Sequence, residues 1–465
     1  MARSRSEPYD VLVVGAGPAG LAAAAAAVGG GARVAVVDAG ERPGGQYWRQ
    51  PSDAVRAGPG RLAADLQHDG ATYDRLTSAS SRAEWYAGRA VWAVTRSAGG
   101  FEVHTVARAD GVESRTTLSA RRLVLAPGAH DRQLPFPGWD LPGVMGAGGV
   151  QALLKEHGVV AGTRVLIAGT GPFLLSVAAG LTAAGSRVVG VHEAASGAGW
   201  ARHPLALARN PAALVQGLDL ARTLTRHRVP LRRRSVVTAA HGDESVSSAT
   251  VGRLGRDSRV VPGSERRVVA DLIAVGWGFT PQLELPLALG CATHVDVDGS
   301  QVCTVDDDQR TSVGGVWVAG EACGVGGAAL AVVEGEIAGS AAAGVAVPAR
   351  ARRRRTAARV FAVALHHAHP VAPGWVDRVT DETLVCRCEE VTAGRLRAAV
   401  DELGADSARS AKLLVRAGMG WCQGRVCGYA ASCLVAARTG GPPSPPLTER
   451  PVAAPLSLGA LADDT

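Results

Sequence analysis

The apolar positions near the N-terminus predict a strand, a helix and a second strand. Residues 11–14 form a continuous apolar run, residues 21–28 form a longer run of small apolar side chains, and residues 33–38 form a third run that ends on Asp38. Short continuous apolar runs are typical of parallel strands that are covered on both faces. We therefore expect a βαβ unit in which the helix begins at Pro18.

The same pattern returns after residue 163 and divides the chain into domains. Residues 164–169 and 187–193 predict two more strands around a helix, and residues 267–275 predict a later strand. Between the two units, residues 87–94 predict a strand, and residues 101–107 with 115–119 predict a β-ribbon. The expected fold class is α/β, with a discontinuous first domain at 8–145 and 270–345, a second dinucleotide-type domain at 146–269, a linker at 346–380, a small and mostly helical domain at 381–440 and a flexible tail at 441–465.

A glycine motif joins the first strand to the first helix. Gly15, Gly17 and Gly20 fit the pattern G-x-G-x-x-G. Gly15 permits a tight turn, Gly17 lets the backbone approach a pyrophosphate at the positive helix N-terminus, and Gly20 allows the helix to pack closely on the strand. Asp38 ends the second strand and can accept hydrogen bonds from ribose hydroxyls. This order of strand, motif, helix, strand and acid predicts a dinucleotide site.

The second unit carries an incomplete form of the same motif. Gly169 and Gly171 occupy the first two glycine positions, but Leu174 stands at the third. The larger side chain alters the packing of helix on strand beside the phosphates without forbidding the fold. This unit could bind NAD(P), another nucleotide such as ATP, or no ligand, and the sequence leaves these three alternatives open.

Four cysteines near the C-terminus form the most specific pattern in the chain. Cys386, Cys388, Cys422 and Cys427 follow C-x-C-x33-C-x4-C. Two close pairs of thiolates suit a [2Fe-2S] cluster, which needs two sulfur ligands for each iron. A structural zinc site is the alternative, but zinc ligands usually have two or more residues between the members of a pair. A helix that starts near residue 425 would also favour the thiolate of Cys427 at its N-terminal end.

The composition indicates a globular protein of a reducing compartment. Hydrophobic residues make up 47% of the 465 residues, and no apolar run is long enough to span a bilayer. The first ten residues lack the apolar segment of a signal peptide. Four of the eight cysteines are assigned to one cluster, which fits a cytoplasmic location.

The net charge of +7 does not indicate a nucleic-acid partner. Nearly all of the basic residues are arginine, and aromatic residues, at 4%, are too few to stack on bases. We interpret the basic run at 350–355 as a solvated linker or a helix end; the alternative is that an acidic partner protein docks on it. The spacing of His366, His367 and His369 matches no metal site.

The domain order over residues 8–345 resembles the two-dinucleotide-domain flavoproteins of the thioredoxin-reductase and glutathione-reductase type. The resemblance implies FAD in the first domain. Two positions differ from that superfamily, which usually has Glu at the position of Asp38 and Asp at the position of Glu321. The chain has no redox Cys-x-x-Cys, so we do not expect it to reduce disulfides. Cys291, Cys303 and Cys323 stand alone in the sequence. Cys323 lies close to the predicted flavin contact, and its role stays open between a function at the flavin and a small buried residue.

The cofactor-binding candidates come from the glycine motifs and from this resemblance. In the first domain they are Gly15, Gly17, Pro18, Ala19, Gly20, Asp38, Gly45, Gln46, Arg49, Ala126, Gly128, Gly320 and Glu321, and in the second unit they are Gly169 and Gly171.

Four segments together narrow the resemblance to a smaller group of proteins within that superfamily. Residues 43–49, 168–175, 386–392 and 418–428 are similar to the α subunits of opine oxidase, D-hydroxyproline dehydrogenase and hydrogen cyanide synthase. The C-terminal module is similar to bacterioferritin-associated ferredoxin. The resemblance implies a partner β subunit similar to D-amino acid oxidase, and in some members a small ferredoxin-like subunit.

The expected function is electron transfer, through FAD and a [2Fe-2S] cluster, in a complex that oxidises proline, hydroxyproline, an opine or a related secondary amine. One alternative is a stand-alone NAD(P)H-dependent reductase that passes electrons through its cluster to an external acceptor. Another is an iron-sensing or iron-delivering module with a vestigial flavin fold. We find no constellation of His, Asp and Ser residues that calls for acid–base catalysis, so no catalytic side chain is predicted.

Overall fold

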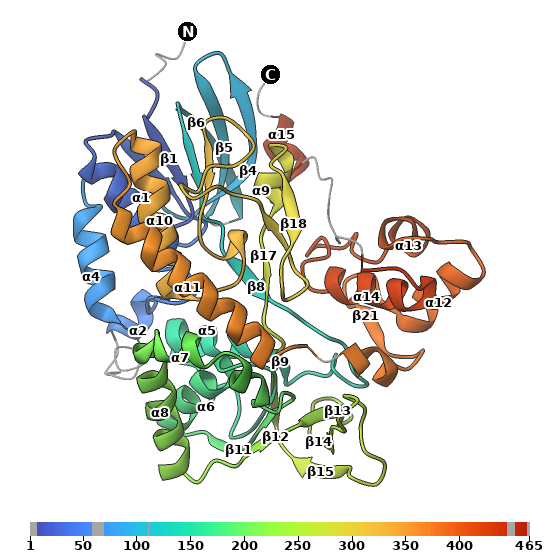
Figure 1. Cartoon of the computed structure of the whole chain (residues 1–465). Coiled ribbons are helices and arrows are strands. Elements are labelled where there is room, and N and C mark those ends of the chain that lie inside the picture. Colours follow the sequence, from blue (N-terminus) through green and yellow to red (C-terminus); the bar gives the residue numbers. More distant parts are fainter. Residues whose placement is uncertain (1–6, 58–68, 110, 372, 444–451, 463–465) are drawn as a thin grey trace.

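The first domain is built on a five-stranded parallel sheet (Figure 1). In the computed structural model, which describes residues 7–57, 69–109, 111–371, 373–443 and 452–462, its strand order is β20-β7-β1-β2-β3. All four pairings are parallel, and Val14 lies opposite Val37, so the carboxyl ends of β1 and β2 share one edge. The strands are β1 (Val11–Val14), β2 (Val34–Val37), β3 (Glu84–Tyr86), β7 (Leu123–Leu125) and β20 (Val316–Val318).

Alternate residues of this sheet face two different layers. Val11 and Val13 pack against small side chains of two helices, whereas Leu12 and Val14 pack against a three-stranded ribbon. This confirms the ribbon predicted at 101–107 and 115–119, and the strand predicted at 87–94 joins it as the third strand. The helices are α1 (Pro18–Gly29) and α10 (Ala328–Ala343), and the ribbon strands are β4 (Arg89–Ser97), β5 (Gly100–Ala109) and β6 (Val112–Ala120).

The second domain has its own five-stranded parallel sheet, in the order β12-β11-β10-β16-β9. Helices α5 (Ala147–His157), α6 (Phe173–Ala183), α7 (Pro204–Ala208) and α8 (Pro211–Arg226) belong to this domain, together with the short helix η1 (Ala198–Arg202) and an antiparallel sheet of β13 (Ser235–His241), β14 (Ser248–Arg253) and β15 (Arg266–Val269). The sheet strands are β9 (Val144–Gly146), β10 (Arg164–Gly169), β11 (Arg187–Glu193), β12 (Leu231–Arg233) and β16 (Leu272–Gly276).

The strand pairing differs from the predicted domain boundaries. β16 lies between β10 and β9 in the second sheet, although the sequence analysis assigns residues from 270 onward to the first domain. A buried apolar strand fits either sheet by its pattern alone, and only its neighbours decide. The chain then crosses between the domains through β8 (Ala129–Asp131) and β17 (Phe279–Pro281), which pair antiparallel.

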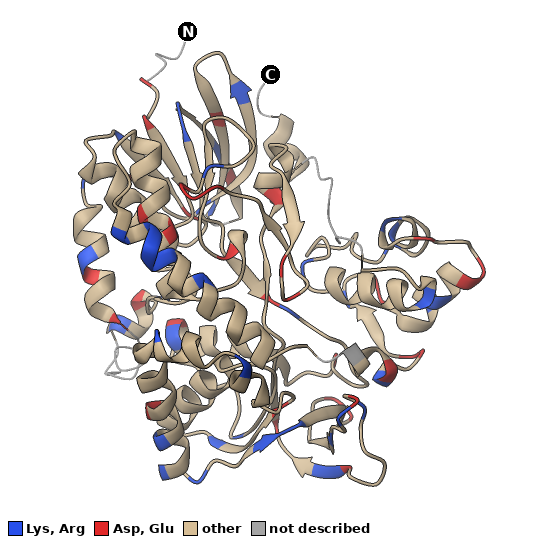
Figure 2. Ribbon diagram, in the orientation of Figure 1, with Lys and Arg blue, Asp and Glu red and all other residues tan. Residues whose placement is uncertain are grey.

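The segment expected to be a linker contains a long helix. Helix α11 (Ala349–Ala368) includes the basic run and lies along α10. Within the run, Arg352 pairs with Asp308 and Arg355 lies 3.6 Å from the fully buried Glu334. Arg359, one turn after the run, pairs with the same carboxylate. Figure 2 shows the basic residues of α11 beside acidic residues of neighbouring elements. The charges of the run are therefore partly bound within the chain, which a count of charges along the sequence could not reveal.

The C-terminal domain is mostly helical, as predicted. It consists of β21 (Leu384–Cys386), β22 (Val391–Thr392), α12 (Ala393–Asp401), α13 (Ala408–Val415) and α14 (Gly428–Thr439). The remaining elements are α2 (Asp53–Ala57), α4 (Gly70–Ala79), α9 (Glu284–Ala288), β18 (Thr293–Val295), β19 (Gln301–Cys303), η2 (Gly320–Cys323), η3 (Pro373–Arg378) and α15 (Leu458–Ala462).

Part of the expected flexible tail is bound to the first domain. The backbone N–H of Ala453 donates to the carbonyl of Trp92 at 2.7 Å, and the N–H of Ser457 donates to the Glu113 carboxylate at 2.8 Å. Residues 444–451 of the predicted tail lie outside the described part of the chain. Within that described part, none of the helices combines the length and the apolar character needed to cross a membrane.

Helices α1 and α10 approach each other at glycines. A Cβ atom added at Gly339 would lie 2.1 Å from the carbonyl oxygen of Ala23, and one at Gly335 would lie 2.0 Å from that of Ala19. Side chains larger than hydrogen at these two positions would push the helices apart. Because α1 begins directly at the glycine motif, this contact also fixes the place of the motif.

We expect Gly339→Ala to destabilise the first domain by about 1–3 kcal/mol, because the added methyl group overpacks the α1–α10 contact. Gly217→Ala is the matched control, since nothing lies within 4 Å of a Cβ atom at this position in α8. The control should raise stability by about 0.5–1 kcal/mol through helix propensity. Thermal unfolding followed by circular dichroism measures both. Equal unfolding midpoints for the two variants would contradict the assigned contact.

Candidate functional site

The three motif glycines have different roles in the structure. A Cβ atom at Gly15 would lie 2.2 Å from the carbonyl oxygen of Ala126, and one at Gly20 would lie 1.7 Å from that of Gly15. Gly15 also has a φ of +98°, which favours glycine. At Gly17, by contrast, the nearest atom is the Cα of Gly45 at 3.9 Å. Gly15 and Gly20 are therefore required for packing, whereas Gly17 leaves open space at the start of α1.

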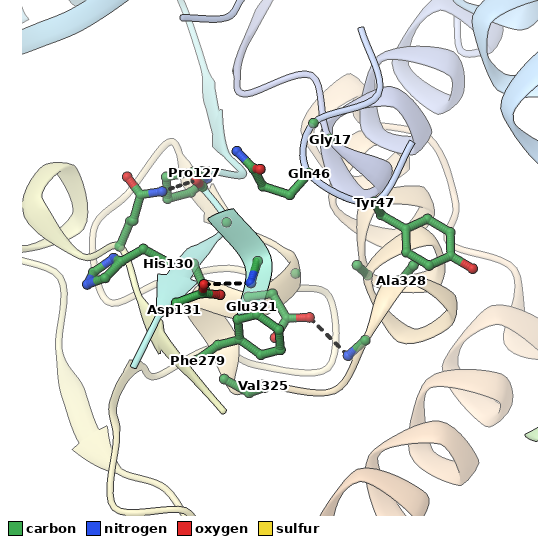
Figure 3. Close-up of a pocket in the computed structure, with 18 of the residues that line it drawn as sticks. Gly17, Gln46, Tyr47, Pro127, His130, Asp131, Phe279, Glu321, Val325 and Ala328 are labelled. Carbon is green, nitrogen blue, oxygen red and sulfur yellow. Dashed lines mark hydrogen bonds between the residues drawn. The ribbon is translucent and has the colours of Figure 1, made fainter. Parts of the chain in front are cut away.

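That space belongs to a cavity of about 1870 Å³. Figure 3 shows that Gln46, Asp131 and Glu321 surround one pocket although they come from different elements. Gly20 and Gly169 do not line the cavity, because each is packed against backbone. That Gly20, Gly169 or any other candidate residue contacts a cofactor stays a prediction. The sequence-predicted residues that line it are Gly15, Gly17, Pro18, Ala19, Asp38, Gly45, Gln46, Arg49, Ala126, Gly128, Gly171, Gly320 and Glu321.

Asp38 is held at the carboxyl end of β2. Its carboxylate accepts hydrogen bonds from the backbone N–H groups of Ala16, at 2.5 Å, and Gly40, at 2.6 Å. Burial raises the pKa of Asp38, and these two N–H groups oppose that shift. The side chain is thus oriented beside the glycine turn, where the ribose of a dinucleotide would lie.

Glu321 lines the same cavity from η2, just before α10. Its carboxylate accepts hydrogen bonds from the N–H groups of Gly326, at 3.1 Å, and Gly327, at 2.9 Å. Burial raises the pKa of Glu321 to about 7, although these N–H groups act against the shift. The Glu321 carboxylate and the N-terminus of α10 are therefore brought together, which is the arrangement that the sequence predicts for a turn that binds the ribityl chain.

Sequence reasoning missed the buried cavity residues Lys155 and Asp131, among others. Lys155, on α5, is 4% exposed and donates from Nζ to the carbonyl of Tyr47 at 3.2 Å. Burial, with a contribution from Arg49, lowers the pKa of Lys155 to about 8. Asp131 accepts from the N–H of Gly148 at 2.8 Å, and burial raises its pKa. The rarity of lysine in an arginine-rich chain could have drawn attention to Lys155, but no pattern marks Asp131.

The second glycine motif keeps its turn despite Leu174. A Cβ atom at Gly169 would lie 1.7 Å from the carbonyl oxygen of Gly276, so this glycine is required. The Leu174 side chain, which is 1% exposed, lies 3.0 Å from the Cβ position of Gly276. Gly276 thus makes room for the larger residue. Glu193 accepts from the N–H of Gly171 at 2.9 Å and fixes this turn in the way that Asp38 fixes the first. Whether this second site binds NAD(P), another nucleotide or nothing stays open.

The four cluster cysteines meet around one loop. Cys386 and Cys427 are hydrogen-bonded to each other, and so are Cys388 and Cys422. The hydrogen bond from Cys427, with further N–H donors, lowers the pKa of Cys386 to about 5. The N–H of Gly418 donates to the Cys386 sulfur at 3.5 Å. Four thiols with amide donors aimed at sulfur fit the ligand set of a [2Fe-2S] cluster.

All four thiols lie near one another. The hydrogen bond with Cys386 and burial raise the pKa of Cys427, and the charges of Cys422 and Cys388 raise it further. As the side chains stand, no group of three or more His, Cys, Asp or Glu among the described residues is arranged to hold a metal ion. A binuclear cluster needs two protein ligands for each iron, and the four thiols would supply them.

The loop between α13 and α14, residues 416–427, carries Cys422 and Cys427 and is called the cluster loop here. It lies against the wall of the large cavity. Cys422, Arg425 and Val426 line the same cavity as Gly17 and Glu321. The loop is fixed there by a hydrogen bond in which Nε2 of His130, on β8, donates to the carbonyl of Arg425 at 2.7 Å.

Two cation–π contacts hold the same interface. The guanidinium of Arg387, between Cys386 and Cys388, lies 4.2 Å from the ring centre of Trp139. The buried Arg132 lies 4.3 Å from the ring centre of Tyr429. The C-terminal domain is therefore docked next to the predicted flavin site.

Three further cysteines, all buried, are neighbours in the core of the first domain. Cys291, Cys303 and Cys323 belong to one hydrophobic cluster, and Cys291 and Cys303 are hydrogen-bonded. The Cys323 thiol donates to the carbonyl of Val318 at 3.2 Å. They are separated in sequence, and only the fold brings them together.

Comparison with known families divides the chain as the structure does. Residues 9–346 match the family described as pyridine nucleotide-disulphide oxidoreductase, and residues 384–437 match the BFD-like [2Fe-2S] binding domain. These matches identify FAD as the cofactor of the first domain and a [2Fe-2S] cluster as that of the C-terminal domain. The open cradle at Gly17 and the four paired thiols fit these two groups.

Individual relatives extend the similarity over nearly the whole chain. An opine oxidase subunit from Rhizobium meliloti (strain 1021) is 36% identical, covering 98% of each chain. The hydrogen cyanide synthase subunit HcnB of Pseudomonas protegens is 32% identical, covering 90% of each.

Among solved structures, L-proline dehydrogenase from P. horikoshii has the same fold, with a TM-score of 0.66 at 18% identity, covering 98% of this chain and 80% of that one. The chain is thus an FAD-dependent oxidoreductase that belongs to the pyridine nucleotide-disulphide oxidoreductase family, in the group that contains this opine oxidase subunit together with HcnB and carries a C-terminal [2Fe-2S] domain.

Proposed function

We propose that this chain is the electron-transfer subunit of a complex that oxidises a secondary amine such as proline, hydroxyproline or an opine. The relatives support membership of a multi-subunit oxidase, because their names describe subunits of opine oxidase and hydrogen cyanide synthase. In this proposal, a partner subunit similar to D-amino acid oxidase carries out the amine oxidation. A small ferredoxin-like subunit completes the assembly in some members.

The observation that carries the proposal is the shared cavity. Gly17 and Glu321, from the flavin side, and Cys422, from the cluster loop, line one cavity. When bound, FAD supplies two-electron chemistry and the [2Fe-2S] cluster supplies one-electron chemistry. Placing both groups beside one cavity suits a protein whose task is to pass electrons.

The residues of the chain hold and orient these groups. The open backbone at Gly17 and the N-terminus of α1 would receive the pyrophosphate, and Asp38 would accept from ribose hydroxyls. Glu321 and the N-terminus of α10 would bind the ribityl chain. His130 fixes the cluster loop against the first domain through Arg425, and Trp139 contacts Arg387, between the first two cluster cysteines.

The cluster assignment predicts different results for two cysteines. Cys388 is exposed, whereas Cys433, on α14, is 9% exposed and lies outside the cluster loop. We expect Cys388→Ala to lose the [2Fe-2S] cluster and to keep FAD, because a thiolate ligand is removed. Cys433→Ala, a more buried change, should keep both.

Iron analysis and electron paramagnetic resonance of the reduced proteins measure this difference. Retention of the cluster in Cys388→Ala, or zinc in place of iron in the wild-type protein, would contradict the assignment.

The substrate proposal is tested on the assembled complex. The chain is co-expressed with the products of neighbouring genes, purified anaerobically and mixed with proline, hydroxyproline or an opine. We expect one of these amines to bleach the flavin absorption band, since electrons would reach the FAD of this chain from the partner. The chain without the partner should not respond to the amine.

Anaerobic addition of NADH and NADPH is the decisive comparison. Rapid bleaching by either nucleotide, with none by the amines, would favour the stand-alone reductase and overturn the proposal.

A further inference from the structure

The basic helix α11 supplies a cation to the interior of the first domain. The guanidinium of Arg359 crosses to α10, where Nη2 lies 2.8 Å from Oε1 of Glu334. The Glu334 residue is 0% exposed, and the Arg359 side chain is 23% exposed. Arg355, one turn earlier on α11, approaches the same oxygen at 3.6 Å. A fully buried carboxylate needs such partners because it has left water.

The second oxygen of Glu334 faces the cavity turn. Its Oε2 accepts a hydrogen bond from the backbone N–H of Gly320 at 3.0 Å. Gly320 and the adjacent Glu321 both line the cavity. A continuous chain of contacts therefore runs from Arg359 through Glu334 to the turn that carries Glu321.

The turn is also confined from the other side. Gly320 has a φ of +81°, and a Cβ atom there would lie 2.9 Å from the Cβ of Ala19, at the start of α1. Arg359 passes over Gly324 as well, where a Cβ atom would lie 2.4 Å from its Nη1. Asp296 lies 4.0 Å from the same nitrogen. The guanidinium is thus held in a fixed position among two carboxylates and the turn.

The charges of the pair reach the cavity turn. Burial raises the pKa of Glu321, and the carboxylate of Glu334 raises it further, whereas Arg359 lowers it. The two members of the pair therefore act on Glu321 in opposite directions.

We propose that Glu334 and Arg359 are positioning residues for the FAD, which fix the Gly320–Glu321 turn and balance the charge beside the flavin. This inference rests on the proposed placement of Glu321 at the cofactor. It assigns to the basic helix a role in the redox site.

The test uses the full chain with FAD and cluster bound. Glu334→Gln leaves Arg359 with only the more distant Asp296, so the flavin midpoint potential should rise, because a nearby cation stabilises the added electrons. Arg359→Gln leaves the buried carboxylate with only the more distant Arg355, so the potential should fall. Each variant should also bind FAD about tenfold more weakly, since the turn loses its fixed partner. Arg359→Lys, which keeps the charge, should return the potential toward the wild-type value.

Arg354→Gln is the matched control on the same helix. Its side chain is 60% exposed and lies 3.8 Å from Glu336 on α10, so it removes an exposed pair between the same two helices. The control should leave both the potential and FAD affinity unchanged, because exposed pairs contribute little. Should either single variant fail to fold, the double variant Glu334→Gln/Arg359→Gln removes both charges. It should bind FAD more weakly with no net shift in potential.

Three outcomes separate this inference from the proposed function. Potentials that move in the same direction, or stay unchanged, in the two single variants would overturn the inference. FAD affinity that is equal to wild type in the double variant would overturn it too. Glu321→Ala tests the placement beneath both ideas: if this variant binds FAD like the wild type, the assigned contact of Glu321 fails, whatever the pair does.

Discussion

The close approach of backbone to backbone around α1 is the constraint on which the rest of the first domain depends. Gly20 brings the helix onto the turn, Gly15 brings the turn onto the backbone of Ala126, and Gly335 and Gly339 bring α10 onto the helix. Each of these positions would place a Cβ atom within 2.2 Å of a carbonyl oxygen from the opposing backbone. The N-terminus of α1 is therefore fixed at the edge of the sheet, and the cavity opens where Gly17 leaves the space unfilled.

Three largely buried carboxylates lie at turns beside the cavity rather than inside the apolar sheet. Asp38, Glu321 and Glu334 each accept backbone N–H groups at a turn beside the cavity. Burial raises the pKa of all three carboxyl groups, and the N–H groups oppose the shift. Such carboxylates hold turns in place despite the cost of their desolvation. Their common location explains why the cofactor side of the domain carries polar residues although its sheet is apolar.

The docking of the C-terminal domain gives the chain its redox architecture. Cluster-loop residues line the cavity of the first domain, and His130, Arg132 and Trp139 hold the C-terminal domain there through Arg425, Tyr429 and Arg387. These three residues come from the stretch that connects the two dinucleotide domains. The connection between domains is thus also the surface that receives the cluster.

The sequence by itself determined the local features: the first βαβ unit, the β-ribbon, the mostly helical C-terminal domain and the family, because each depends on periodicity or on the spacing of a few residues. The tertiary structure alone decided the place of β16 in the second sheet, because an apolar strand is compatible with either sheet. It also decided that α11 supplies Arg359 to a buried carboxylate, and that Cys422 shares a cavity with Gly17. These contacts join residues that are far apart in the chain, and no local pattern encodes which distant partner a charge or a loop will meet.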